Sequence, residues 1–167
     1  MIYILTGGPA TGKGTRSDFL SKGLGIPHIS TGEILREVSK NNKEIADKLS
    51  KGELISDEII TELLRERITK EDCKKGFILD GYPRTLKQVG LLDDLLASLN
   101  RKITKVIELT APDEVVFKRI LERRQCPKCG RMYGIDFPPV KQNVCDDCAG
   151  ELVIRTDDTK ETLKARI

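Results

Sequence analysis

The sequence lacks the long apolar segments that membrane and secreted proteins carry. No run approaches the roughly 18 apolar residues that cross a bilayer, and the apolar run at residues 2–5 is too short for a signal peptide. Internal repeats and low-complexity tracts are also absent. We therefore expect a soluble, cytoplasmic protein with no membrane partner.

A strong charge of one sign is absent as well. The 29 basic and 26 acidic residues leave a net charge of +3, which by itself is too weak to indicate nucleic acid. His28 is the single histidine, and since a lone histidine beside a strand is usually packed or exposed, we assign it no chemistry. The 167 residues, 38% of them apolar, suffice for one compact core with small insertions. We expect a monomer whose partners are small molecules.

A glycine-rich stretch, residues 7–15, stands between a short β-prone run at 2–6 and a helical pattern at 13–23. Its spacing is G-x-x-x-x-G-K, with Gly14 where serine or threonine is usual and Thr15 one place later. In such a loop, inward-pointing N–H groups and the helix N-terminus attract a polyphosphate. Lys13 adds a positive charge, and Thr15 offers a hydroxyl to Mg²⁺. An ordinary glycine-rich turn is the alternative, but the flanks and the lysine favour a nucleoside triphosphate site.

Strand and helix patterns alternate along the rest of the chain. Helices are expected after Thr31, taken as an N-cap, and after the capping sequence that begins at Ser56. This alternation predicts an α/β fold, a parallel sheet with helices on both faces. The expected strands are 2–6, 27–30, 76–80 and 106–109, and the expected helices are 13–23, 31–38, a small excursion at 40–53, 56–68, 86–99, 113–124 and 159–166.

Asp80 ends an apolar run, Phe77-Ile78-Leu79, and is followed by a glycine. At the carboxyl edge of a parallel sheet an aspartate can hold Mg²⁺ through water. A strand that simply ends in an Asp-Gly turn is the alternative, and the phosphate loop favours the Mg²⁺-linked role. Arg84 leaves the same edge and can pair with a phosphate.

Four of the five cysteines form two C-x-x-C pairs, Cys126/Cys129 and Cys145/Cys148, sixteen residues apart. Four thiolates suit a closed, structural Zn²⁺ site, with iron as the other candidate ion and redox or unpaired cysteines as the alternative. We expect the glycines behind the pairs, Gly130 and Gly150, to permit the tight turns. The residues between the pairs predict a small β-rich flap that needs its metal to fold. Cys73 stands apart as an unpaired thiol.

Cationic side chains adjoin these motifs on several separate segments, which suggests a site for more than one polyphosphate. Phosphoryl transfer needs alignment and compensation of charge more than covalent chemistry. A closing flap would also exclude water. The cations are Lys13, Arg36, Arg84, Arg119, Arg123, Arg155 and Arg166.

Together the motifs resemble the adenylate kinase family, in its bacterial form with a long zinc-bearing lid. The resemblance covers essentially the whole chain and is carried by residues 7–15, 30–33 and 77–85, the Arg119/Arg123 pair and the four-cysteine insert. It implies the reaction ATP + AMP ⇌ 2 ADP with Mg²⁺, a transferase activity of nucleotide biosynthesis. It also implies a P-loop core at 1–29, 59–123 and 159–167, a monophosphate-binding segment at 30–58 and a lid at 124–158.

The resemblance further implies a role for individual residues. Those that would bind ATP are Ala10, Thr11, Gly12, Lys13, Gly14, Thr15, Arg119, Arg123, Met132 and Tyr133. Those that would bind AMP are Thr31, Arg36, Glu53, Leu54, Ile55, Gly81, Tyr82, Pro83, Arg84, Gln88, Arg155 and Arg166. The catalytic cations would be Lys13, Arg84, Arg119, Arg123, Arg155 and Arg166. Apart from the resemblance, Gln88 would be taken for a solvent-facing side chain.

Two departures from the family pattern affect these expectations. Ala10 and Thr11 replace the usual Gly-Ala of the loop, and alanine is less free than glycine at positive φ. Family members also continue past the position of Ile167 through a helix, a strand and a closing helix, so a sheet edge and a core face are expected to lie open. Three other functions stay open: another nucleoside-monophosphate kinase, a fragment that binds nucleotide without turnover, and a zinc-ribbon module that binds nucleic acid.

Overall fold

The computed structural model describes residues 1–50 and 55–154, and the chain forms two compact units. The first, here called the sheet unit, contains residues 1–7 and 12–109. The second, here called the cysteine unit, contains residues 8–11 and the chain from 110 onward. The predicted monophosphate-binding segment at 30–58 thus belongs to the same compact unit as the sheet, while the predicted three-part division stays a prediction. Among the described residues, no helix is both long and apolar enough to span a bilayer.

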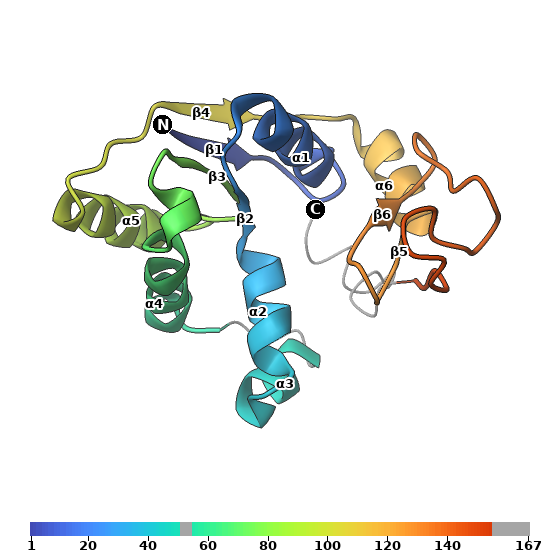
Figure 1. The fold of residues 1–167 in the computed structure, drawn as a ribbon, viewed down its shortest axis with the longest axis horizontal. Helices are drawn as coiled ribbons and strands as arrows, with labels where there is room; N and C mark the ends of the chain where they lie inside the picture. The colour runs from blue at the N-terminus through green and yellow to red at the C-terminus, as the bar shows by residue number, and fades with distance from the viewer. Residues whose placement is uncertain (51–54, 155–167) are drawn as a thin grey trace. The chain divides into compact units, whose positions relative to one another are not determined.

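A four-stranded parallel sheet forms the centre of the sheet unit (Figure 1). Its order is β2-β3-β1-β4, and β1 pairs in parallel with both β3 and β4. This confirms the predicted α/β class. The strands are β1 (Ile2–Thr6), β2 (His28–Ser30), β3 (Phe77–Asp80) and β4 (Lys105–Glu108).

In the described part of the sheet unit, five α-helices and one short 3-10 turn connect these strands. Local capping fixes two of the helix starts: Ser56 accepts from the Ile59 N–H at 3.3 Å, and Thr85 accepts from the Gln88 N–H at 3.1 Å. The helices are α1 (Lys13–Leu24), α2 (Thr31–Ser39), α3 (Lys43–Ser50), α4 (Asp57–Ile68) and α5 (Leu86–Ser98), and the 3-10 turn η1 is Glu71–Cys73.

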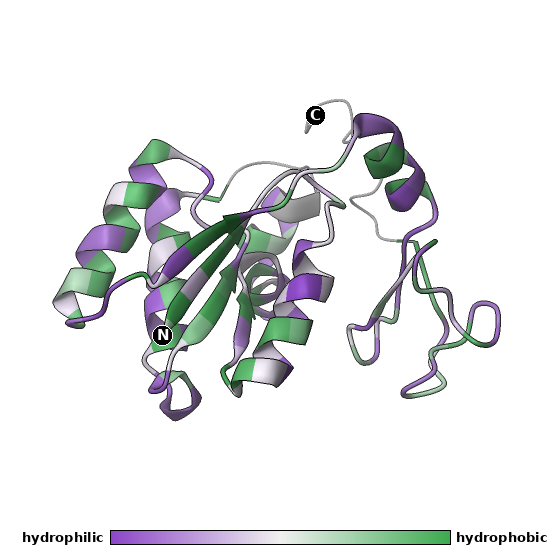
Figure 2. Ribbon diagram, turned by 90° about the horizontal axis from the view of Figure 1, so that it is seen from above, coloured by the Kyte–Doolittle hydropathy of each residue, from purple (hydrophilic) through white to green (hydrophobic). Residues whose placement is uncertain are grey.

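Alternate residues of the strands face opposite layers, as the two-residue period of a strand requires. On one face Ile2 and Ile4 pack in a cluster with Leu64 of α4 and Leu92 of α5. On the other face Leu5 and Ile78 pack with Ile26, and Leu20 of α1 lies against them. Figure 2 shows the strands as the predominantly hydrophobic layer of this unit. Helices therefore cover both faces, which leaves the carboxyl ends of the strands as the place where polar side chains gather.

Up to residue 154, the cysteine unit contains one helix and short antiparallel pairings, and the predicted helix at 159–166 lies outside the described residues. α6 (Asp113–Leu121) ends three residues before the predicted end of this helix. β5 (Arg124–Gln125) pairs with β6 (Met132–Tyr133), and single bridges join residues 125 to 153 and 144 to 151. The predicted β-rich flap is confirmed. Among the described residues of this flap, the buried core is Cys126, Tyr133, Cys145 and Leu152, with Cys148 packed against them.

Candidate functional site

The sheet-unit part of the phosphate loop follows β1 and opens α1. Gly7 has a φ of 133°, and a Cβ there would come within 2.1 Å of the Leu109 carbonyl oxygen, so only glycine fits. Gly12 caps α1 with a φ of 95°. The Lys13 ammonium donates to the Gly7 carbonyl at 2.9 Å, which brings its charge back over the start of the loop. These contacts place a cation beside a helix N-terminus, the arrangement expected for phosphate binding.

Asp80 lies beside this loop, at the carboxyl end of β3. Its side chain is largely buried, the residue being 9% exposed, and in the sheet it is the register partner of Leu5 on β1. A Cβ at Gly14 would lie 3.9 Å from the Asp80 Oδ2, so the carboxylate faces the first turn of α1. Mg²⁺ usually keeps several waters and takes one or two protein carboxylates. Asp80 fits that requirement as the carboxylate, and Thr15 is an exposed residue in the first turn of α1.

His28, to which the sequence assigned no chemistry, lies between two carboxylates. Its Nδ1 is 2.7 Å from Asp18 Oδ1, and its Nε2 is 3.4 Å from Asp80 Oδ2. Burial lowers the pKa of His28, but the two carboxylates outweigh it and raise that pKa from 6.5 to about 9. The charged imidazolium therefore lies within ion-pair distance of Asp80, although no described residue makes a hydrogen bond to its Nε2. Sequence spacing gave no signal, because Asp18, His28 and Asp80 come from three separate elements.

The carbonyl of Gly81 joins two residues expected to bind the monophosphate. It accepts from the Thr31 hydroxyl at 3.1 Å and from Arg84 Nε at 2.8 Å. Gly81 has a φ of 82°, and a Cβ there would lie 3.1 Å from the guanidinium of Arg84. The prediction that Thr31 caps α2 is wrong, because the N-cap is Ser30 and the Thr31 hydroxyl is directed to Gly81 instead.

Gln88 is 6% exposed, so the alternative of a solvent-facing glutamine is wrong. Its Oε1 accepts from the Arg84 backbone N–H at 2.6 Å, and its Nε2 donates to Asp57 Oδ1 at 2.6 Å. Asp57 was read from the sequence only as part of a helix start. Its contact with Gln88 spans 31 positions and has no local signal.

The other residues expected at the monophosphate site differ in burial and in the contacts they make, and four of them are not described. Arg36 curls over Gly32, where a Cβ would meet its Nη1 at 3.3 Å. Ile55 is buried, and the Tyr82 hydroxyl lies 2.7 Å from Thr61 Oγ1 inside the unit. Pro83 is half-buried. Glu53, Leu54, Arg155 and Arg166 lie outside the described residues.

The remaining loop residues and the two paired arginines belong to the cysteine unit. Ala10 has a φ of 52°, in the left-handed region. Alanine adopts this region less freely than glycine does. The Ala10 carbonyl accepts from Arg119 Nη1 at 3.4 Å, and Arg119 Nε donates to Asp136 at 2.8 Å. Thr11 closes the loop onto the Gly8 carbonyl at 2.9 Å. Arg123 follows α6 and is half-buried.

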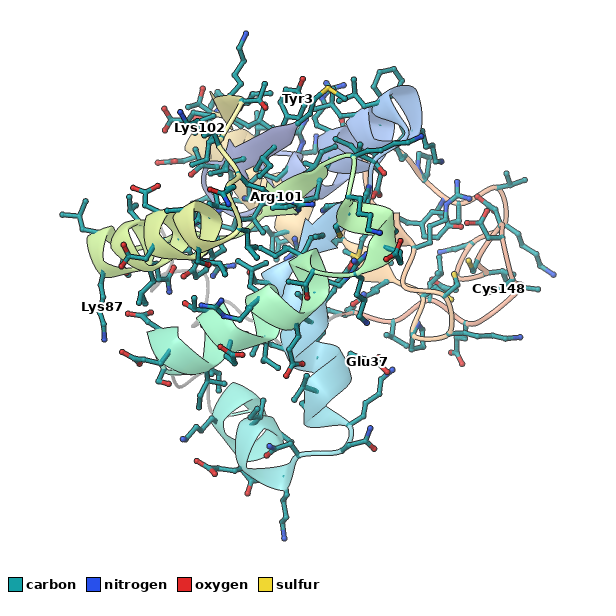
Figure 3. All side chains as sticks on the ribbon, turned by 60° about the vertical axis from the view of Figure 1, so that its left-hand side comes forward. Tyr3, Glu37, Lys87, Arg101, Lys102 and Cys148 are labelled. Carbon is teal, nitrogen blue, oxygen red and sulfur yellow. The ribbon has the colours of Figure 1, made fainter. Side chains whose placement is uncertain are left out.

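The four cysteines meet in one cluster. Their sulfur atoms all lie within 4.8 Å of one another, and the Cys126–Cys148 and Cys129–Cys145 pairs are 3.4 Å apart. Figure 3 shows these sulfurs beside the labelled Cys148. Thiolates about 2.3 Å from a tetrahedral Zn²⁺ sit at roughly this mutual spacing. The donor set therefore fits a closed, structural zinc site, which a pattern of unpaired cysteines would not produce.

The two C-x-x-C turns are built alike, but not with the glycines that the sequence suggested. In each, the fourth residue after the first cysteine donates its N–H back to that cysteine: Gly130 to Cys126 at 2.8 Å, and Ala149 to Cys145 at 2.9 Å. Both donors have positive φ, 81° and 55°. Gly150 serves another purpose, because a Cβ there would lie 3.0 Å from the Cys126 sulfur. The expectation that Gly150 makes the second turn is therefore wrong.

Tyr133 packs into this cysteine cluster, where it is 4% exposed. Its hydroxyl accepts from the Asp146 N–H at 2.7 Å and donates to the Cys145 sulfur at 3.4 Å. That donation lowers the pKa of Cys145 to about 6 and so favours the thiolate. Met132 is more accessible. Tyr133 thus supports one of the four clustered cysteines, while the expected contacts of both residues with ATP stay predictions.

Comparison with known proteins shows which protein family the chain resembles. A family model described as adenylate kinase matches residues 5–167. An adenylate kinase of Caldicellulosiruptor bescii is 48% identical over 172 residues, which cover all of this chain and 80% of the relative. Adenylate kinases of Thermotoga neapolitana and Archaeoglobus fulgidus are each 46% identical, over 99% of this chain and 79% of the relative. The chain thus spans about four-fifths of the length of these curated relatives.

Proposed function

This chain belongs to the adenylate kinase family, and we propose on that basis that it transfers the terminal phosphoryl group of ATP to AMP, giving two molecules of ADP. One observation carries the proposal beyond family membership. Asp80 and Gly81 are neighbours in the chain; Asp80 faces the phosphate loop, while Gly81 bonds to Thr31 and Arg84. A donor site and an acceptor site therefore adjoin at the end of one strand.

In this proposal the sheet unit supplies alignment and charge. Lys13 and the loop amides hold the ATP phosphates, and Arg36 and Arg84 hold the phosphate of AMP. Because the transferred group gains little from covalent chemistry, fixed cations account for most of the rate enhancement. Gln88 holds the base of AMP. Arg119 and Arg123 add charge on the ATP side, and Arg155 and Arg166 are expected to do so at the phosphates.

Two ions complete the proposal. Bound Mg²⁺ would neutralise phosphate charge, with Asp80 and Thr15 as the groups that hold its hydration shell. Zn²⁺ on the four cysteines would take no part in the chemistry and would hold the fold of the cysteine unit. The thiolate donor set, rather than a disulfide pattern, supports a reducing cytoplasmic compartment. A monomeric state and the lack of nucleic-acid or membrane partners stay predictions.

An ADP-forming assay with AMP, UMP, CMP and GMP as acceptors tests the function. We expect AMP to be preferred, and Lys13→Ala to lower kcat at least about a hundredfold with zinc content and helix content unchanged. Lys22→Ala, which removes an exposed lysine of the same helix, is the matched control and should keep full activity. ATP binding without ADP formation would reduce the chain to a nucleotide-binding protein, and preference for another acceptor would move it to another monophosphate kinase.

A further inference from the structure

The amide of Gln88 is held at both ends. Its oxygen accepts from the Arg84 N–H and its nitrogen donates to the Asp57 carboxylate, each at 2.6 Å. The side chain is also buried, at 6% exposure. A glutamine amide without such partners can exchange its oxygen and its NH₂ group by a half-turn.

These two partners permit only one orientation of the amide. A half-turn would place the amide oxygen against the Asp57 carboxylate and the NH₂ group against the N–H of Arg84. Acceptor would then face acceptor and donor would face donor, leaving buried polar groups unpaired. Asp57 is the stronger of the two constraints because a hydrogen bond to a charged group is about twice as strong as one between neutral groups.

The orientation leaves one defined donor and one defined acceptor for a ligand. An amide nitrogen has two hydrogens and an amide oxygen accepts two hydrogen bonds, so one of each remains after Asp57 and Arg84 are served. Adenine offers a donor, N6–H₂, next to a ring acceptor, and an amide matches that pair with both its ends. Guanine carries the acceptor O6 where adenine carries N6–H₂, so the same fixed amide meets it with the wrong polarity.

We propose that Asp57 is a positioning residue that sets the base preference of the acceptor site by fixing the polarity of the Gln88 amide. This inference rests on the proposed function, in which Gln88 holds the base of AMP. Asp57 touches no substrate in the proposal. It acts through Gln88, so that adenine is favoured over guanine.

The neighbouring contacts separate this role from a merely structural one. Glu58, next in the chain, pairs with Lys87 at 2.5 Å and so also ties α4 to α5. Both side chains of this pair are 61% exposed, and Lys87 is labelled on α5 in Figure 3. Thr85 caps α5 and Thr61 holds the Tyr82 hydroxyl without help from the Asp57 carboxylate. A loss of helix packing would therefore follow from either acid, whereas a change in base preference should follow from Asp57 alone.

Four variants test the proposal: Asp57→Asn, Glu58→Gln, Gln88→Ala and the double variant Asp57→Asn/Gln88→Ala. For each, calorimetry gives the Kd for AMP and for GMP, and the ADP-forming assay gives kcat and KM. Asp57→Asn keeps an acceptor oxygen at position 57, but that oxygen is uncharged and the asparagine amide can also turn its NH₂ group toward Gln88. The Arg84 N–H is then the main group that fixes the Gln88 amide. We expect the KM and Kd for AMP to rise about fivefold, kcat to stay nearly unchanged and the preference for AMP over GMP to fall about fivefold.

Two control variants distinguish a positioning role of Asp57 from a purely structural one. Glu58→Gln should leave the AMP-to-GMP preference unchanged, and Asp57→Asn should have no further effect on that preference once Gln88 is alanine. If Asp57→Asn and Glu58→Gln behave alike, or if Asp57→Asn changes the preference in the absence of the Gln88 amide, the inference is overturned. If the unmodified chain binds AMP but forms no ADP, the proposed function fails instead, and the binding preferences still test Asp57.

Discussion

The two units of this chain are stabilised in different ways. The sheet unit buries a cluster of twelve residues from its strands and helices, among them Phe77, Leu64 and Leu95 at 0–1% exposure. In the described part of the cysteine unit, burial is confined to two small clusters: two cysteines, one tyrosine and one leucine, and the pair Val116 and Ile120 of α6. Val140 and Phe137 stay 94% and 63% exposed. Apolar burial can hold the first unit. The described part of the second has little of it, so we expect a metal on the four cysteines to hold its turns together.

The two units also differ in where their polar and charged groups lie. In the sheet unit polar groups gather where the strands end, and His28 is held between Asp18 and Asp80. In the cysteine unit the polar centre is the core itself. Perturbing the metal should therefore affect one unit, and perturbing the histidine should affect the other.

Metal loss should give the largest effect. Replacing Cys129 by serine removes one of four ligands, so we expect the bound zinc to be lost and the cysteine unit to unfold while the sheet unit persists. Structural zinc sites contribute on the order of 10 kcal/mol to folding. Metal analysis by plasma mass spectrometry, together with limited proteolysis in residues 124–154, measures both consequences.

The fifth cysteine provides the control for that experiment. Cys73 is completely buried in the sheet core and lies outside the sulfur cluster. Cys73→Ser should keep the zinc and lower only the stability of the sheet unit. Unchanged zinc content in Cys129→Ser would contradict the metal assignment.

Titration of His28 should give an intermediate effect, confined to the sheet unit. Its pKa is raised from 6.5 to about 9 in the fold, so its stabilisation is fully present below pH 6.5 and is lost as the pH rises through 9. We expect the free energy of unfolding to fall by about 2 kcal/mol across that range, since solvent screens the exposed Asp18 partner. Urea unfolding followed by helical circular dichroism at pH 6 to 9.5 measures the change.

A glutamine at position 28 separates this effect from other titrations. His28→Gln keeps a polar side chain but carries no charge, so the fall between pH 6.5 and 9 should disappear. An equal fall in both proteins would assign the pH dependence to other groups.

The turns of the cysteine cluster should give the smallest effect. Gly130 and Ala149 occupy equivalent left-handed positions, and a side chain there costs about 1 kcal/mol. Gly130→Ala should speed zinc release to a colorimetric chelator about fivefold. Ala149→Gly should slow it by less, because glycine also raises the entropy of the unfolded chain. Equal release rates in all three proteins would contradict the backbone argument.

Local patterns predicted the elements and motifs well, because each depends on residues close together in the chain. The phosphate loop, the strand that ends at Asp80 and the two C-x-x-C turns all have short, defined spacing. The sequence did not reveal that Ala149 rather than Gly150 forms the second turn. No local pattern indicates that a side chain at position 150 would bring its Cβ within 3.0 Å of the Cys126 sulfur.

Partners of the site residues could not be predicted in the same way. Asp57 reads as a helix start, His28 as a lone strand residue and Asp136 as a loop acid. Their contacts with Gln88, Asp80 and Arg119 join segments 17 to 52 positions apart. Hydrogen bonds between such segments depend on register and helix placement, and these leave no periodic trace in the sequence.

The sequence by itself determined the α/β class, the phosphate-binding loop and the presence of a four-thiolate site, because glycine spacing, hydrophobic alternation and cysteine spacing are local constraints on the backbone. Only the tertiary structure decided which acidic side chain contacts which partner. The register of β2 against β3 places His28 opposite Ile78, two residues from Asp80, and the packing of α4 against α5 brings Asp57 to Gln88. These pairings arise from packing of the whole unit, and a single segment does not contain the information that specifies them.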